Sequence, residues 1–274
     1  MYSHIIVNGG LGNQMFQYAF ALALRHRGHH VVMDTSLYNY AIMHNGYELE
    51  RVFGIEEPLI NKKGLHLGWL RFLLKYKPTL FLSNDHLCFD KSNLDSPKRY
   101  LYGYWQNEQY FKDVADEIRR KFVFQGIDER NQLIAREMNG CNSVSVHIRR
   151  GDYETSGMLL LDEDYYSRAF DLLLEKVADP VLYIFSDDCQ AAETIVSKYY
   201  DEYKYKIIDW NKGADSYKDM YLISQCRHHI LANSSFSWWG AWLNDSRNKI
   251  VIAPKCWVYN NPELCPQVDG WIKL

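Results

Sequence analysis

The chain has 274 residues, of which 47% are hydrophobic and 24% are charged, and this is the composition of an ordinary globular protein. It excludes a disordered, collagenous or coiled-coil chain, and the length suits two modest domains or one large one. The formal charge of −3 leaves no global electrostatic footprint for duplex nucleic acid, so we expect no nucleic-acid partner and expect any bound anion to be held locally.

The cysteines and the N-terminal residues indicate the cellular compartment in which the protein is expected. The six cysteines are scattered and show no CxxC or metal-ligand spacing, which is typical of reduced thiols. The first residues lack the basic and apolar regions of a secretion signal, and no stretch is long and apolar enough to span a membrane. We therefore expect a cytoplasmic protein.

The first predicted elements surround a glycine-rich turn. A short apolar run at 5–7 meets Gly-Gly-Leu-Gly at 9–12, and an amphipathic stretch follows over 14–27, so the pattern predicts a strand, a turn and a helix. The turn has no Gly-Lys-Ser/Thr, and Met15 stands where a dinucleotide fingerprint has its third glycine. Gly10 and Gly12 therefore either make a tight turn or let a ligand approach the backbone.

The run 58–84 is basic and amphipathic. It carries five Lys or Arg residues and no acid, and its aromatic and apolar side chains share one helical face. Such a helix either lies on an anionic membrane surface or packs on the core with a solvated basic side. The first alternative predicts peripheral contact with the cytoplasmic face of a membrane.

A polar stretch at 124–142 separates two series of elements. We place the boundary there, with an N-terminal domain over 1–135 and a C-terminal domain over 136–274. Beyond it, strand-like runs at 143–149, 181–186, 205–210 and 228–232 alternate with helical segments. Strands interleaved with helices predict βαβ units, and hence an α/β fold with parallel sheets.

Two adjacent arginines, Arg149 and Arg150, end the strand-like run at 143–149. Ligands of open parallel sheets bind beyond the carboxyl ends of the strands, so we expect these guanidiniums at the edge of a crevice. They favour a phosphate or carboxylate ligand, and the alternative is a pair of structural salt bridges.

The segment 233–237, Asn-Ser-Ser-Phe-Ser, precedes a helix that contains Trp238, Trp239 and Trp242. Backbone N–H groups and hydroxyls at a positive helix terminus form a natural cradle for a diphosphate, although helix capping alone explains the same residues. The tryptophans serve either as a core or as a sugar platform. The acids at 162–164 and 187–188 are candidates for metal ligands or for helix N-terminal residues, and we favour the helix reading for 162–164.

Four strings together resemble the motifs of glycosyltransferase family 11, the alpha-1,2-fucosyltransferases. They are GGLGNQMFQYAFALAL at 9–24, HIRRGDY at 147–153, FSDD at 185–188 and DMYLISQCRHHILANSSFSWWGAWLN at 219–244. Their order matches nearly the whole chain. The resemblance implies an inverting enzyme of the GT-B type, with two Rossmann-like domains whose parallel sheets face a central cleft. It implies transfer of L-fucose from GDP-fucose to a terminal galactose of an oligosaccharide or glycolipid, without a cofactor or metal.

The resemblance also assigns roles to residues of this chain. It implies that the N-terminal domain binds the acceptor and the C-terminal domain binds GDP-fucose. Arg149 would hold the β-phosphate of the leaving group with support from Arg150, His147 would lie by the guanine, and Asp219 would accept from guanine N1 and N2. The residues implied to contact or approach the donor are Ser234, Ser235, Ser237 and Asp187.

Asn13 resembles an asparagine near the reacting sugar in related fucosyltransferases. The general base stays open between Asp152, Glu154 and a mechanism without a strong base, because the loop after HIRRGDY is shorter than in many family members. Two alternatives to the main hypothesis remain. One is a fucosyltransferase of another linkage or acceptor, and the other is a non-catalytic glycan-binding module that uses the tryptophans.

Overall fold

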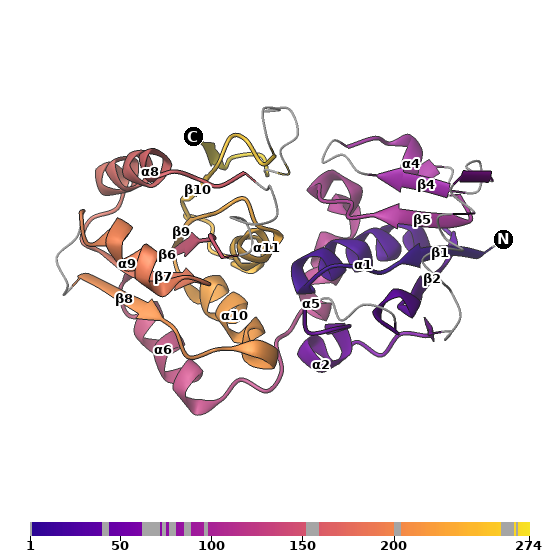
Figure 1. Ribbon diagram of the computed structural model, residues 1–274, viewed down its shortest axis with the longest axis horizontal. Helices are drawn as coiled ribbons and strands as arrows, with labels where there is room; N and C mark the ends of the chain where they lie inside the picture. The colour runs from indigo at the N-terminus through magenta and orange to yellow at the C-terminus, as the bar shows by residue number, and fades with distance from the viewer. Residues whose placement is uncertain are drawn as a thin grey trace. The chain divides into compact units, whose positions relative to one another are not determined.

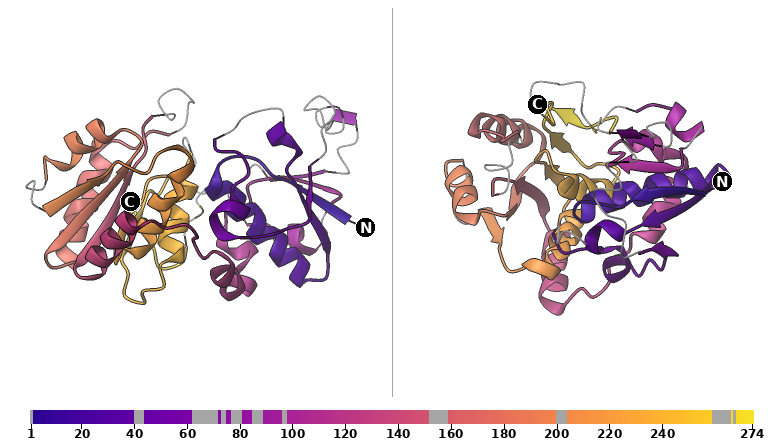
Figure 2. Two further views of the ribbon diagram at one scale, coloured as in Figure 1. Left: turned by 90° about the horizontal axis from the view of Figure 1, so that it is seen from below. Right: turned by 45° about the vertical axis from the view of Figure 1, so that its right-hand side comes forward.

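The computed structural model describes residues 2–39, 44–61, 72, 75–76, 81–84, 89–95, 98–151, 159–199, 204–258, 266 and 268–274. The chain divides into two compact units, Met1–Gln125 and Gly126–Leu274, and each contains one parallel sheet with helices packed around it (Figures 1 and 2). The expected α/β fold with two parallel sheets is confirmed.

The first unit is built around strand β1. In chain order its described elements are β1 (Tyr2–Ile6), α1 (Leu11–His26), β2 (His30–Asp34), η1 (Ser36–Asn39), α2 (Leu49–Phe53), β3 (Leu59–Ile60), β4 (Phe81–Asn84), α4 (Ser92–Asp95), β5 (Tyr100–Gly103), η3 (Glu108–Tyr110), η4 (Lys112–Val114) and α5 (Ala115–Lys121). The strand order is β3-β2-β1-β5-β4, and all pairs are parallel. The loops that follow β1 and β5 therefore open side by side at one edge of the sheet.

Helix α1 is the helix predicted over 14–27. It begins after Gly10, which has extended backbone angles, and Gly28 follows its end with a φ of +85°. The helix is buried along most of its length, because Phe16 contacts Phe111 and Phe20 stacks on Trp105 at 4.1 Å. Its aromatic face thus anchors the helix to the segment that follows β5.

The second unit is a six-stranded parallel sheet between two helical layers. In chain order its described elements are α6 (Glu129–Asn139), β6 (Asn142–Ile148), α8 (Glu163–Lys176), β7 (Pro180–Ser186), α9 (Cys189–Val196), β8 (Tyr205–Ile208), η6 (Gly213–Asp215), α10 (Tyr217–Gln225), β9 (His228–Ile230), α11 (Ser235–Leu243), β10 (Val251–Ala253) and β11 (Ile272–Lys273). The strand order is β11-β10-β9-β6-β7-β8. The alternation in β6 sends Val144, Val146 and Ile148 into the core shared with α8 and α9, as the sequence predicts.

The division between the units falls earlier than the predicted boundary at 135/136. That boundary lies inside helix α6, where Ala135 and Met138 pack with Phe185 of β7 in one core. Gln125 belongs to the first unit, because its backbone N–H donates to the carbonyl of Val52. The polar stretch at 124–142 is therefore largely a solvated helix of the second unit and not a linker.

Most of the basic run 58–84 lies outside the described residues, so its expected amphipathic helix is not described. Within the part of the chain that the structure describes, no helix is both long and apolar enough to cross a membrane.

Candidate functional site

The carboxyl end of β6 carries the arginine pair, and the neighbouring strand β7 supplies a carboxylate to it. Ile148 lies opposite Ser186 in the sheet, so the next residues of both strands meet. Arg149 Nε lies 3.2 Å from Asp187 Oδ2, and Arg150 N–H donates to Asp187 Oδ1 over 3.0 Å. Asp187 therefore orients the Arg149 guanidinium, whose side chain keeps 28% of its surface exposed.

Two other acids of the predicted groups, Asp188 and Asp162, cap helices. Asp188 Oδ1 accepts from Ala191 N–H at the start of α9, and Asp162 Oδ1 accepts from Tyr165 N–H at the start of α8, both over 3.0 Å. Across the described ranges, no group of three or more His, Cys, Asp or Glu side chains is placed to hold a metal ion. The capping interpretation of these acids accounts for their positions.

His147 lies on the polar face of β6 and is almost completely buried. Burial and the charge of Arg149 lower the pKa of His147 to about 3, so its imidazole is neutral at pH 7. Its ring lies 6.1 Å from that of Phe236 at the start of α11, and Tyr166 OH donates to its backbone carbonyl. Within the described residues, His147 Nδ1 is buried without a hydrogen-bond partner, and a bound ligand or water is the natural partner for such an atom.

The N-terminus of α11 lies at the same edge of the sheet as the arginine pair, because β9 pairs with β6. Ser234 Oγ caps the helix by accepting from Phe236 N–H, and Ser234 and Ser235 are both partly exposed. Ser237 is completely buried and donates to the carbonyl of Ser234, so it stabilises the turn and presents no surface to a diphosphate. The direct contact with a diphosphate stays a prediction for Ser234 and Ser235, whereas the burial of Ser237 argues against it for that residue.

The tryptophans of α11 form a core. Trp238, Trp239 and Trp242 are at most 2% exposed, and their rings pack on one another at centroid distances of 5.0 to 6.2 Å. They have no face available for a sugar, which excludes the platform interpretation.

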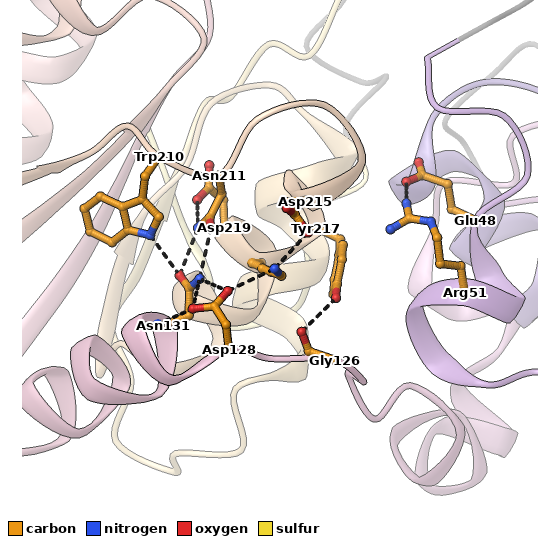
Figure 3. A network of polar contacts seen from close by, with 11 residues as sticks. Glu48, Arg51, Gly126, Asp128, Asn131, Trp210, Asn211, Asp215, Tyr217 and Asp219 are labelled. Carbon is orange, nitrogen blue, oxygen red and sulfur yellow. Dashed lines mark hydrogen bonds and ion pairs between the residues drawn. The ribbon is translucent and has the colours of Figure 1, made fainter.

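Asp219, in the first turn of α10, is held by a chain of buried amides (Figure 3). Asn211 Nδ2 donates to Asp219 Oδ1 over 2.8 Å and to Asn131 Oδ1 over 2.9 Å, and Asn131 Nδ2 donates back to Asn211. Burial raises the pKa of Asp219 to about 7, against the opposing effects of the Asn211 hydrogen bond and the Lys212 charge. Asp219 as a whole residue is only partly exposed.

A charged cluster adjoins this amide chain (Figure 3). Asp128 caps α6 at Asn131, and Lys218 Nζ lies 2.9 Å from Asp128 and 2.8 Å from Asp215. The Asn131 N–H and Lys218 hold the pKa of Asp128 well below its usual range. Helices α6 and α10 are thereby fixed to each other on either side of Asn211. The sequence analysis missed Asn131, Asn211 and Lys218. The only available signal was the position of Asn211, which follows the strand β8 closely.

In the first unit, two buried glutamines brace the glycine-rich turn. Gln14 Nε2 donates to the carbonyls of Gly9 and Gly46, while Gln14 Oε1 accepts from Glu48 N–H. Gln17 bridges the ends of β1 and β5, since it accepts from Asn8 N–H and donates to the carbonyl of Gly103. Two glutamines three residues apart in a largely apolar stretch were the available sequence signal, which the helix prediction did not use.

The position for an anion at the start of α1 is occupied by the protein's own carboxylate. Glu48 accepts from the Leu11 N–H, its side chain is 3% exposed, and Arg51 forms an ion pair with it (Figure 3). Gly10 packs against the His44 ring, which a Cβ would approach to 3.3 Å, and Gly12 is buried in the helix. Tight packing accounts for both glycines, and among the described residues the Glu48 carboxylate takes the place that a phosphate would have at this turn.

Asn13 stands at the carboxyl edge of the first sheet and is partly exposed. Gln106, which follows β5, donates from Nε2 to Asn13 Oδ1 over 2.7 Å. The two candidates for the general base, Asp152 and Glu154, lie outside the described residues.

Known proteins with similar sequences are glycosyltransferases. The chain is 32% identical to an alpha-1,2-colitosyltransferase of Escherichia coli, over 97% of this chain and 96% of that protein. It is 30% identical to the O-antigen biosynthesis glycosyltransferase WbnK of Escherichia coli over the full length of both proteins. It is 25% identical to the galactoside alpha-(1,2)-fucosyltransferase 1 of Rattus norvegicus, over 97% of this chain and 76% of that protein.

A solved structure shares the fold. The NodZ alpha-1,6-fucosyltransferase, in crystals soaked with GDP-fucose, superposes with a TM-score of 0.55 at 15% identity over 89% of this chain and 93% of that one. The GT-B type of fold is thereby confirmed. The sequence profile of glycosyl transferase family 11 matches residues 2–267, and the chain belongs to this family of glycosyltransferases.

Proposed function

We propose that the protein is an inverting alpha-1,2-fucosyltransferase that moves L-fucose from GDP-fucose to a terminal galactose of a glycan. The observation that carries the proposal is the meeting of Arg149 and the α11 N-terminus at the ends of the neighbouring strands β6 and β9. When the bond between fucose and the diphosphate breaks, negative charge grows on the departing GDP. A fixed guanidinium and a helix N-terminus stabilise such charge in advance of the reaction.

Asp219 supports guanine as the base of the donor. A carboxylate accepts two parallel hydrogen bonds, and the N1–H and N2–H groups of guanine present two donors on one edge. Adenine and uracil lack this pair of donors. Because Asn211 holds one oxygen of Asp219, the carboxylate plane is oriented before the base arrives.

In the proposed reaction, the 2-hydroxyl oxygen of galactose attacks C1 of fucose from the face opposite to GDP. The bond from C1 to the β-phosphate oxygen breaks, its electron pair leaves with GDP, and the hydroxyl proton passes to a base or to solvent. Asp152 and Glu154 remain the candidates for that base. Asn13 is a neutral amide, so its proposed role near the sugar is to hydrogen-bond and not to take the proton.

We also propose that catalysis needs no metal and no cofactor, because Arg149, Arg150 and the helix terminus supply the positive charge that a cation would supply elsewhere. The acceptor is a galactose-terminated oligosaccharide or glycolipid. A cytoplasmic location with peripheral membrane contact through the run 58–84 accords with a lipid-linked acceptor. Salt-sensitive binding of the protein to anionic vesicles tests that contact.

Transfer of colitose is the second candidate function, favoured by the 32% identity to an alpha-1,2-colitosyltransferase. The same leaving-group machinery serves both sugars, so donor choice depends on groups around the sugar. A non-catalytic glycan-binding module is disfavoured, because the tryptophans on which it depends are buried.

A donor comparison tests the proposal. The protein is incubated with GDP-fucose or GDP-colitose and a panel of galactosides, with and without excess EDTA, and GDP release and product linkage are measured. We expect turnover of GDP-fucose to an alpha-1,2-linked product in both conditions. Turnover of GDP-colitose alone would establish colitose transfer as the function. A loss of turnover in EDTA, with turnover restored by Mn²⁺ or Mg²⁺, would exclude metal independence.

A further inference from the structure

The loop that follows β5 contains a strained residue. Trp105 has a φ of +56°, which is unfavourable for a bulky side chain. Its indole is completely buried against Phe20, and Trp105 Nε1 has no hydrogen-bond partner within the described part of the chain. Strained backbone and an unsatisfied buried donor persist only where the surrounding structure enforces them, and such outliers cluster at functional sites.

The residue that this strained backbone presents is Gln106. Gln106 is 7% exposed, and its Nε2 donates over 2.7 Å to Oδ1 of Asn13, 93 positions away in the chain. A Cβ on Gly9 would come within 2.5 Å of Asn13 Nδ2, so the Gly9 backbone also lies close to this side chain. The Asn13 carboxamide is therefore held by the Gln106 hydrogen bond and by close packing against the Gly9 backbone.

We infer that Gln106 is a positioning residue that acts through Asn13, and that Asn13 serves as a hydrogen-bond donor to an oxygen of a bound sugar. The inference rests on the proposed function, in which Asn13 lies near the reacting sugar. With Asn13 Oδ1 engaged by Gln106, the group left to meet a ligand is the Nδ2 amino group, for which the described residues provide no acceptor. A hydroxyl or ring oxygen of a sugar is the acceptor that this donor fits.

Substitutions of Gln106 separate positioning from packing. In Gln106→Ala the Asn13 amide is free to rotate, and we expect kcat to fall about tenfold to a hundredfold while KM for the donor changes by less than about threefold. In Gln106→Glu the new carboxylate accepts and cannot donate, so the Asn13 amide turns over and presents its oxygen, and we expect at least the same loss. Gln109→Ala is the matched control, because Gln109 is an exposed glutamine in η3, three residues further along the chain.

A double-mutant cycle shows whether Gln106 acts through Asn13. We expect Asn13→Ala combined with Gln106→Ala to be no slower than Asn13→Ala alone, because the second residue then has nothing to position. Losses that multiply would overturn the inference, as would full kcat in Gln106→Ala. A loss of activity that follows a matching fall in Tm would assign Gln106 a purely structural role and would also overturn it.

A measurement without turnover distinguishes failure of this inference from failure of the proposed function. In ¹⁵N NMR spectra, the Asn13 side-chain amide signals, assigned by their absence in Asn13→Ala, should shift in Gln106→Ala and stay in place in Gln109→Ala. If they do not shift, Gln106 does not hold Asn13. If they shift while the wild-type protein turns over neither donor, the proposed function fails and the contact stands, but the sugar-binding role of Asn13 is refuted.

Discussion

Arg149 and Asp187 are joined at 3.2 Å across two neighbouring strands, and Asp187 also accepts the N–H of Arg150. One carboxylate thus sets both the side-chain direction of the first arginine and the backbone of the second. Gly151 completes the arrangement, because a Cβ at that position would approach Asp187 Oδ2 to 3.0 Å. The three residues following β6 are therefore arranged around a single carboxylate.

Arg149→Ala should lose at least about a hundredfold to a thousandfold in kcat, because one donor aimed at developing charge contributes about that much. Arg149→Lys keeps the charge but loses the planar pair of donors, so it should recover little. GDP affinity should fall much less than kcat, since the interaction strengthens as the bond breaks. Initial rates and GDP titrations check this, and a folded Arg149→Ala retaining a tenth of wild-type kcat would contradict the role.

Asp187→Asn tests the orienting carboxylate. The amide keeps one acceptor oxygen but loses the charge that holds Arg149, so we expect kcat to fall about tenfold or more with a smaller change in KM. Asp188→Asn is the matched control, since an asparagine still caps α9. Equal effects of the two substitutions would show that Asp187 has no special relation to the arginines.

Asp219 predicts a pH-dependent preference for guanine. Only its ionised form accepts two hydrogen bonds from the base, and its pKa is raised to about 7. GDP affinity should therefore fall as pH drops below 7, approaching about tenfold per pH unit. Calorimetric titrations with GDP and UDP between pH 5.5 and 8.5 measure this, and a pH profile for GDP no steeper than that for UDP would remove the assignment.

The raised pKa of Asp219 also predicts that GDP binding and the stability of the fold oppose each other at this position. A carboxyl whose pKa is raised in the folded state destabilises the fold as pH rises above its unfolded pKa. Asp219→Asn should therefore raise Tm by roughly 2–4 °C at pH 8, with a smaller gain at pH 5, while it weakens GDP binding. Thermal unfolding of both proteins at both pH values tests this prediction. A Tm of Asp219→Asn below that of the wild type at pH 8 would show that the Asn211 contact outweighs the cost of the buried charge.

His229 predicts acid sensitivity of the second unit. Its ring is buried between Ser145 and Asn244, over 2.8 and 3.0 Å, and burial with the charge of Lys249 lowers the pKa of His229 well below its usual range. Its contribution to stability is present above the unfolded pKa of about 6.5 and is lost as pH falls, by up to about 1.4 kcal/mol per pH unit.

His229→Gln serves as the comparison, because its amide can replace both hydrogen bonds without titrating. The difference in unfolding free energy between this variant and the wild type should shrink or reverse between pH 7.5 and 5. Comparing the two proteins at the same pH cancels the opposite effect of Asp219. A difference that stays constant over this range would show that His229 does not govern the acid sensitivity.

The strands and the Arg149 position could be predicted from the sequence, because alternation in β6 and the rule for parallel strand ends are local properties. The hydrogen bond of Gln106 to Asn13 and the support of Asp219 could not. Gln106 and Asn13 are 93 residues apart, and Asn131 and Asn211 are 80 apart, so no local pattern joins them. The serines at 234, 235 and 237 look equivalent as a motif, and only the buried helix turn separates Ser237 from the other two.

The carboxylate of Glu48 at the start of α1 has a consequence for the choice of buffer and inhibitor. The helix terminus beneath it would attract oxyanions if Glu48 were truncated to alanine, and sulfate or inorganic phosphate would then compete for a position that the intact protein fills itself. In the intact protein, inorganic phosphate should therefore find no position at the start of α1, because the Glu48 carboxylate already accepts from the Leu11 N–H.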